Sequence, residues 1–220
     1  MKTKVAGKKL KAPDKLLKAM LEFVDYLKNN VKLYLILASI IIVVTAVVVL
    51  VNYFTNKKEE NGRKTLYSIS QQLQTLDKDK SEAAIRLIEE NLSKLGNTTA
   101  RLEAQYMLAE IYYNNKNWDK AINNYEVVTK KAKGLIKELA LLGFAYSEEN
   151  KGDIKEALNS FIKMKELNSS VYKDVAMMGI ARCYQKLGDK NNALAAYESV
   201  IIAYPDSDMA RLASAAKTDL

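Results

Sequence analysis

A 36-residue repeat in the C-terminal half of this 220-residue chain constrains its fold more than any other feature. Three segments align without gaps and share a small residue followed one helical turn later by an aromatic one. They are "WDKAINNYEVV" (118–128), "DIKEALNSFIKM" (153–164) and "DKNNALAAYESVI" (189–201), with the pairs Ala121/Tyr125, Ala157/Phe161 and Ala193/Tyr197. Small residues let two helices approach closely, and aromatic residues fill the space between successive helix pairs. A period of about 34 to 36 residues with this pattern is typical of stacked helix pairs.

A second helix-forming segment precedes each of these three, at 104–117, 140–153 and 176–189. We align these segments on a shared motif: Leu108-Ala109-Tyr112, Leu142-Gly143-Tyr146 and Ile180-Ala181-Tyr184. This alignment places two extra residues in the second copy, between Tyr146 and Gly152. After the third copy, Pro205 is expected to end the last repeat helix. Together these residues resemble the tetratricopeptide repeat, although the first two copies lack the closing Pro. The resemblance implies an all-α chain whose repeats form an α-solenoid.

Further helices are expected on both sides of the repeats. Residues 60–76 and 81–96 place Leu and Ile at helical spacing, and we interpret 57–100 as a degenerate helix pair that begins the array. A short helix from about Asp208 to Lys217, capped by a residue among 206–208, is expected to shield the other end. Residues 101–220 are therefore expected to hold three repeats and a C-terminal capping helix.

Residues 33–56 contain no charged side chain, and their core, Leu33–Val51, is a continuous apolar run. As a helix rising about 1.5 Å per residue, this run is close to the ~30 Å hydrocarbon thickness of a bilayer. A single run in lipid satisfies its backbone only as a helix. A cleaved signal peptide has a shorter apolar region nearer the N-terminus, and a core helix of a water-soluble domain is rarely so apolar. We therefore interpret 33–56 as a retained transmembrane helix, which can continue further because no Pro or Gly lies between Leu33 and Gly62.

Most of the net charge of +8 lies before this span. Residues 1–56 carry nine Lys against three acidic residues, whereas the rest is close to neutral, which argues against a nucleic-acid-binding face. The positive-inside bias predicts a cytoplasmic N-terminus and repeats on the outer side. Residues 1–12 are expected to be disordered, and 13–32 place Leu, Met and Val at helical spacing among lysines. This basic cytoplasmic segment, 1–32, predicts an amphipathic helix on the anionic leaflet or, alternatively, on a partner's cytoplasmic loop.

No catalytic, metal-binding or cofactor-binding pattern occurs in the sequence. The chain has no His, which excludes Ser-His and Cys-His nucleophiles, and its single Cys excludes an internal disulfide or a cysteine-cluster metal site. Cys183 is expected to pack as a small hydrophobe, and the acidic pairs Glu89/Glu90 and Glu148/Glu149 are expected on solvated faces. An enzyme is therefore not expected, and neither a cofactor nor a small-molecule substrate is implied.

The remaining candidate site is a protein-binding groove. In tetratricopeptide proteins the first helix of each pair lines the concave face, and the resemblance carries that role to this chain by repeat position. The candidates are Tyr106, Glu110, Tyr113 and Asn114 in the first copy, Phe144 in the second, and Arg182 and Lys186 in the third. Aromatic side chains offer adaptable contacts, and the two cations suit an acidic partner. The alternative for each residue is that it packs between helices or faces solvent. Tyr106 and Glu110 occupy two positions of the clamp with which some members bind a C-terminal carboxylate, so that recognition is not implied.

The whole layout resembles single-span bacterial tetratricopeptide proteins such as the ancillary subunit of the SecYEG translocon. It combines a basic N-terminus, one span, a degenerate helix pair and three repeats. The resemblance implies a single-pass inner-membrane protein with its repeats in the periplasm. Its implied partners are the lipid bilayer and translocon subunits, a periplasmic chaperone or nascent secreted chains. The alternative is a structural scaffold for envelope assembly, cell division or motility complexes.

Overall fold

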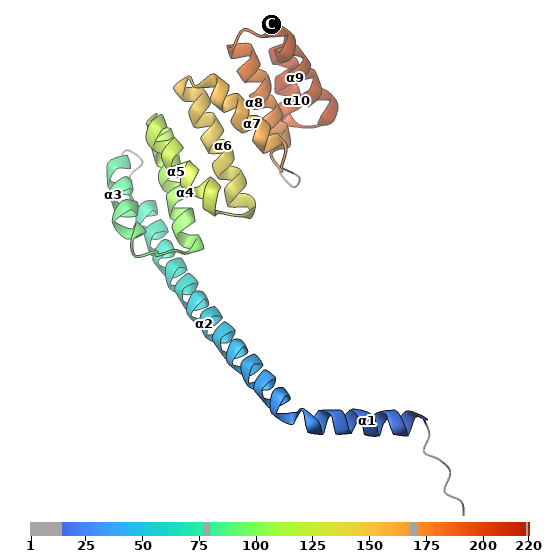
Figure 1. Ribbon diagram of the computed structural model, residues 1–220. Coiled ribbons are helices and arrows are strands. Elements are labelled where there is room, and N and C mark those ends of the chain that lie inside the picture. The colour runs from blue at the N-terminus through green and yellow to red at the C-terminus, as the bar shows by residue number, and fades with distance from the viewer. Residues whose placement is uncertain (1–14, 77–79, 168–170, 219) are drawn as a thin grey trace, which may run out of the picture. The chain divides into compact units, whose positions relative to one another are not determined.

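The computed structural model describes residues 15–76, 80–167, 171–218 and 220 (Figure 1). The disorder expected for residues 1–12 lies outside this range. Every regular element in the described range is an α-helix, as the repeat pattern predicts. The chain divides into two units, one that ends at Thr55 and one that runs from Asn56 to Leu220.

The first unit contains α1 (Lys15–Asn29) and the N-terminal part of α2 (Val31–Thr75). Asn30 separates the two helices, and its Nδ2 donates a hydrogen bond to the Tyr26 carbonyl at 2.9 Å. Of the described helices, α2 alone is long and apolar enough to cross a bilayer, a criterion of length and composition that a signal sequence near the N-terminus also meets. None of its most apolar window is buried. A core helix of a water-soluble domain would be covered at these positions.

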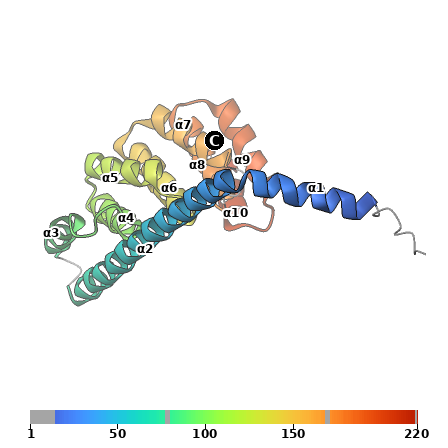
Figure 2. The same cartoon turned by 60° about the horizontal axis from the view of Figure 1, so that its bottom comes forward.

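The second unit stacks helices in chain order (Figures 1 and 2). From α3 to α10 each helix packs against the next one. After α2 come α3 (Ser81–Leu92), α4 (Thr99–Asn114), α5 (Trp118–Lys131), α6 (Gly134–Lys151), α7 (Ile154–Lys165), α8 (Lys173–Lys186), α9 (Lys190–Ala203) and α10 (Asp208–Thr218). The pairs α4/α5, α6/α7 and α8/α9 correspond to the three predicted repeats. Leu66 and Ile69 of α2 and Ile88 of α3 extend the same core toward the N-terminal end.

The buried side chains follow the 36-residue period through both helices of each pair. Five positions are fully buried in all three copies: Ala104/Ala140/Ala176, Ala109/Ala145/Ala181, Ala121/Ala157/Ala193, Tyr125/Phe161/Tyr197 and Val128/Met164/Val200. The alignment of the second copy was therefore wrong, because Ala145 rather than Gly143 is the counterpart of Ala109. No residues are inserted in that copy.

Gly143 has a different role, which explains the misleading motif. It lies against the ring of Tyr125 from the preceding pair, where an added Cβ would be 2.4 Å from Tyr125 Cζ. Gly179, 36 residues later, lies against Phe161 in the same way, with an added Cβ 2.6 Å from the ring. These two glycines let the first helix of one pair approach the aromatic residue of the pair before it.

The turns inside the pairs follow the same period. Lys116, Gly152 and Gly188 have positive φ angles of 58°, 99° and 78°. Gly adopts this left-handed conformation without strain, whereas the Cβ of a lysine makes it costly. The residues that follow cap the second helices: the side chains of Asn117 and Asp189 accept hydrogen bonds from backbone N–H groups three residues on.

Both ends of the array are closed by local contacts. At the N-terminal end, the Glu59 carboxylate accepts hydrogen bonds from the Thr99 N–H at 3.1 Å and so caps α4. At the C-terminal end, the Ser207 hydroxyl accepts from the Ala210 N–H at 3.1 Å, within the predicted cap range 206–208. α10 packs on α9 and extends one residue beyond the predicted helix.

Candidate functional site

The first helices of the three pairs present one set of side chains in common register, here called the first-helix face. It consists of Tyr106/Leu142/Met178, Glu110/Tyr146/Arg182, Tyr113/Glu149/Gln185 and Asn114/Asn150/Lys186, on α4, α6 and α8 respectively. Six of the seven predicted site residues belong to it. Phe144 does not, because the corrected register makes it the counterpart of the core residues Leu108 and Ile180. It is half-buried and packs against the core.

Glu110 is engaged inside the domain. The Tyr125 hydroxyl donates a hydrogen bond to Glu110 Oε1, and the Tyr106 ring lies 5.8 Å from the Tyr125 ring. Burial, followed by the Glu110 charge, raises the pKa of Tyr106, and burial together with the Glu110 hydrogen bond raises that of Tyr125. Both phenols therefore stay neutral and act as hydrogen-bond donors. Glu110 joins the two helices of the first pair more than it offers a free charge.

Tyr113 joins the first and second pairs. Its hydroxyl accepts a hydrogen bond from Asn150 Nδ2 at 2.9 Å, and the same amide nitrogen donates to the Tyr146 carbonyl at 2.9 Å. The Tyr113 ring meets Trp118 edge to face with 5.2 Å between centroids. Because the hydroxyl accepts in this contact, its own proton remains available to a ligand. Trp118, which follows the turn between α4 and α5, therefore also packs against Tyr113 of the first-helix face.

Arg182 and Lys186 converge on Glu149 from α8. Arg182 Nε and its terminal nitrogen donate to the two Glu149 oxygens at 3.1 and 2.7 Å, and Lys186 Nζ lies 2.9 Å from Glu149 Oε1. The guanidinium also stacks over Tyr146, 5.3 Å from the ring centroid. Burial raises the pKa of Glu149, but the hydrogen bonds and charges of the two cations outweigh it and lower the value. The two cations that were predicted to suit an acidic partner are therefore already paired within the chain.

The prediction that Glu148 and Glu149 are solvated was wrong. Their residues are 9% and 6% exposed. The Ser160 hydroxyl donates to Glu148 Oε2 at 2.6 Å, and burial raises the pKa of Glu148. The 36-residue register carries the signal that could have located them, because it aligns the pair with Tyr112 and Tyr113. Glu89 and Glu90, by contrast, are exposed as predicted.

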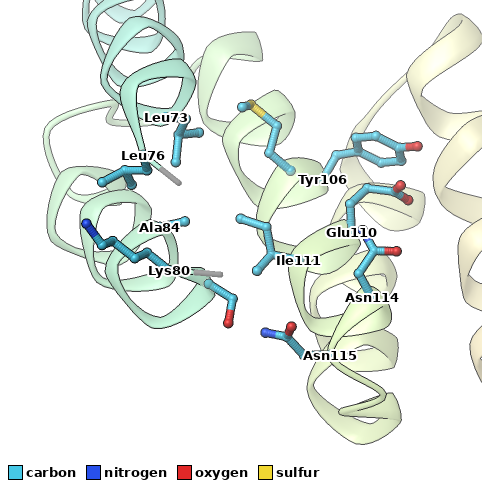
Figure 3. Close-up of a pocket in the computed structure, with 11 residues that line it drawn as sticks. Leu73, Leu76, Lys80, Ala84, Tyr106, Glu110, Ile111, Asn114 and Asn115 are labelled. Atoms are coloured by element: carbon cyan, nitrogen blue, oxygen red, sulfur yellow. The ribbon is translucent and has the colours of Figure 1, made fainter. Parts of the chain in front are cut away.

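A pocket that the sequence did not reveal lies between α2, α3 and α4, with a volume of about 450 Å³. Its wall is mostly apolar, and its rim is polar. Eleven residues line it: Leu73, Leu76, Lys80, Ser81, Ala84, Tyr106, Met107, Glu110, Ile111, Asn114 and Asn115. Figure 3 shows Ala84 and Ile111 facing each other across the space, whereas the Tyr106 ring and the Glu110 carboxylate point to the other side of α4. Exposed Asn114 links this pocket to the first-helix face.

Among the described residues we looked for a metal site and for a reactive thiol. No group of three His, Cys, Asp or Glu side chains in the described ranges is placed to hold a metal ion. Cys183 is fully buried, and burial raises its pKa to about 12, so its thiol is neither charged nor accessible at neutral pH. What the arrangement can do is contact another chain through aromatic, amide and apolar groups.

Comparison with known proteins agrees with the geometry. Two segments, 103–133 and 175–207, match the family described as tetratricopeptide repeat. These two segments are tetratricopeptide repeats. The middle copy is not among the matched segments, and it carries Glu148 where the other copies carry Tyr112 and Tyr184. No curated protein matches the chain.

Solved structures share the repeat fold. PcrH from Pseudomonas aeruginosa superposes with a TM-score of 0.50 at 20% identity, over 56% of this chain and 94% of PcrH. PcrH in complex with the chaperone-binding region of PopB gives 0.48 at 21% identity, over 55% and 97% of the two chains. MamA AMB-1 gives 0.49 at 18% identity, over 71% and 92%. At this identity the likeness to PcrH establishes the fold, a tetratricopeptide solenoid.

Proposed function

We propose that this chain is a membrane-anchored tetratricopeptide scaffold that holds a protein partner on its first-helix face. The observation that carries the proposal is the 450 Å³ apolar pocket that Asn114 links to that face. Leu73, Ala84 and Ile111 offer a place for an apolar side chain of a partner. Asn114, which lines the pocket, and Tyr113 on the first-helix face offer hydrogen bonds to a backbone. Buried apolar anchors surrounded by polar contacts are the usual source of affinity at protein interfaces.

The partner surface differs from the one expected from sequence. Because Arg182 and Lys186 already share the carboxylate of Glu149, an acidic partner gains less from them than from free cations. Removing either cation from a buried carboxylate is costly. We therefore infer that selectivity comes from apolar and aromatic contacts around Ile111 and Tyr113.

The anchor is the apolar stretch of α2. Its Ile and Val side chains are about half exposed or more. An aliphatic helix of this length that is not covered by other protein groups is unfavourable in water and stable in lipid. Nine lysines precede the stretch, and few cations follow it closely, which supports a cytoplasmic N-terminus and a periplasmic repeat domain. Tethering the domain to a bilayer raises the effective concentration of a weak binding face at one place.

The basic N-terminus, single span and following repeats support a role at the outer face of a bacterial inner membrane. We propose that the face assists translocated proteins near the Sec translocon, together with a periplasmic chaperone. A scaffold for envelope assembly, cell division or motility uses the same layout and is the alternative. Catalysis has no part in either role.

Photocrosslinking in living cells separates these roles. A photoreactive residue replaces Tyr113 or Asn114 on the first-helix face, and the exposed Asn123 of α5 serves as the matched control. The proposal predicts adducts with translocon subunits or secreted chains from the first two positions and not from the third. Adducts only with cell-wall or appendage proteins would favour the alternative. Equal adducts from all three positions would contradict a binding role for this face.

Topology needs its own test. A reporter that is active only in the periplasm is fused after Leu220 in the full chain. We expect an active reporter. An inactive reporter in a stable fusion would reverse the proposed orientation without affecting the binding face.

A further inference from the structure

α1 presents an apolar face that no described residue covers. Leu17, Met20, Leu21, Phe23, Val24 and Leu27 are 36% to 61% exposed. At about 100° per residue, these six side chains fall within one arc of roughly 160° around the helix. Lys15, Lys18, Glu22 and Asp25 occupy the opposite arc. The helix is therefore amphipathic, with an apolar face and an opposite charged face.

The edges of the apolar arc carry the residues favoured at a lipid–water boundary. The aromatic side chains of Phe23 and Tyr26 lie toward one edge, and Lys28 lies at the other. Aromatic rings prefer the headgroup level of a bilayer, and lysine can place its alkyl chain in the apolar layer with its ammonium group among phosphates. Such edges suit a flat boundary between oil and water.

The charge of this segment selects the kind of surface. Residues 15–32 carry four lysines against Glu22 and Asp25, and residues 1–14 add five more lysines against Asp14. This excess is attracted to anionic phospholipid headgroups. The apolar stretch of α2 begins at Leu33, four residues after α1 ends. Insertion of that stretch brings α1 within reach of the headgroups of the same bilayer.

We propose that α1 is an interfacial helix that lies on an anionic phospholipid surface, with Met20 and Val24 at the boundary with the acyl chains and its lysines among the phosphates. The inference rests on the proposed insertion of α2, and it adds lipid selectivity to it. An aliphatic helix that only spans a bilayer is indifferent to headgroup charge. A basic interfacial helix responds to the content of anionic lipid and to ionic strength.

The test uses the full chain in lipid nanodiscs. Single cysteines replace Val24 on the apolar face, Glu22 on the polar face and Val44 in the span, in a Cys183→Ala background whose fold is checked by circular dichroism. Each carries a bimane fluorophore, and quenching by lipids brominated in their acyl chains measures its depth. The nanodiscs contain either phosphatidylcholine alone or phosphatidylcholine mixed with phosphatidylglycerol.

We expect the Val24 label to be quenched strongly in the anionic discs and weakly in the neutral ones, and the Glu22 label to be quenched little in both. Lys18→Gln and Lys28→Gln should each lower the bound-to-free ratio of α1 about fivefold in the anionic discs. A Val24 label that stays in water while the Val44 label is quenched would overturn the interfacial helix and point to a protein partner for α1. An unquenched Val44 label would instead overturn the proposed anchor.

Discussion

Replacing Arg182 with Met tests whether the buried network around Glu149 holds the second and third repeats together. Met keeps much of the side-chain length and its contact with the Tyr146 ring, but it removes both hydrogen bonds to Glu149. Glu149 is then left with Lys186 alone, whose side chain is 46% exposed. Breaking a buried ion pair costs about 3 to 5 kcal/mol, and the remaining lysine places this variant near the lower end, at about 3 kcal/mol.

Urea unfolding of the full chain in detergent, followed by far-ultraviolet circular dichroism, measures the cost. The double variant Glu149→Gln/Arg182→Met removes both charges. It should destabilise the chain less than the sum of the two single changes, because it leaves neither charge buried without its partner. Lys130→Met, which breaks an exposed pair with Glu126 on α5, is the control and should cost less than about 1 kcal/mol. If Arg182→Met unfolded at the same urea concentration as the wild type, the network would not stabilise the array.

Three further predictions concern the repeat register and the same network. Lys116→Gly should stabilise the chain by about 0.5 to 1 kcal/mol in a thermal melt, because it relieves the left-handed strain that Gly152 and Gly188 avoid; a melting temperature below wild type would contradict this. Ala157→Trp should lower stability by about 3 kcal/mol or more through overpacking, and a melt identical to wild type would refute its place in the core. The pKa of Glu149 is lowered in the folded chain, so its contribution is present above about pH 4.5 and is lost as the pH falls further. The stability difference between wild type and Glu149→Gln should therefore shrink between about pH 6 and about pH 3, and a difference that grew on acidification would have the wrong sign.

The second helices of the repeats could be predicted in detail from the sequence. Ala121, Ala157 and Ala193, with the aromatic residue four positions after each, are core contacts as expected, because packing of successive pairs requires the same side-chain sizes every 36 residues. Such repeated packing leaves a direct record in the sequence.

The first helix of the second copy could not be read as reliably. Gly143 and Tyr146 imitate the motif of the neighbouring copies, yet they lie two residues out of register. A local motif does not reveal that Gly143 is small for another reason, namely that the ring of Tyr125 packs directly against it. Extending the strict 36-residue spacing to Ala145 would have corrected the alignment and shown that Glu148 and Glu149 occupy half-buried or buried tyrosine positions.

The pocket could not be found from sequence, because it depends on how three helices are spaced. Leu73, Ala84 and Ile111 are ordinary apolar residues in a helical pattern, and nothing in their spacing along the sequence sets them apart.

The most direct test of the central claim is the yield of adducts from a photoreactive residue at Asn114 when the pocket is altered. Ile111→Ser removes an apolar wall of the pocket without adding charge, and a melt confirms that the array still folds. We expect this change to abolish most adducts from position 114, whereas the control position 123 should give no specific adducts with or without it. Undiminished adducts from position 114 in the folded variant would show that the pocket and its face do not hold the partner.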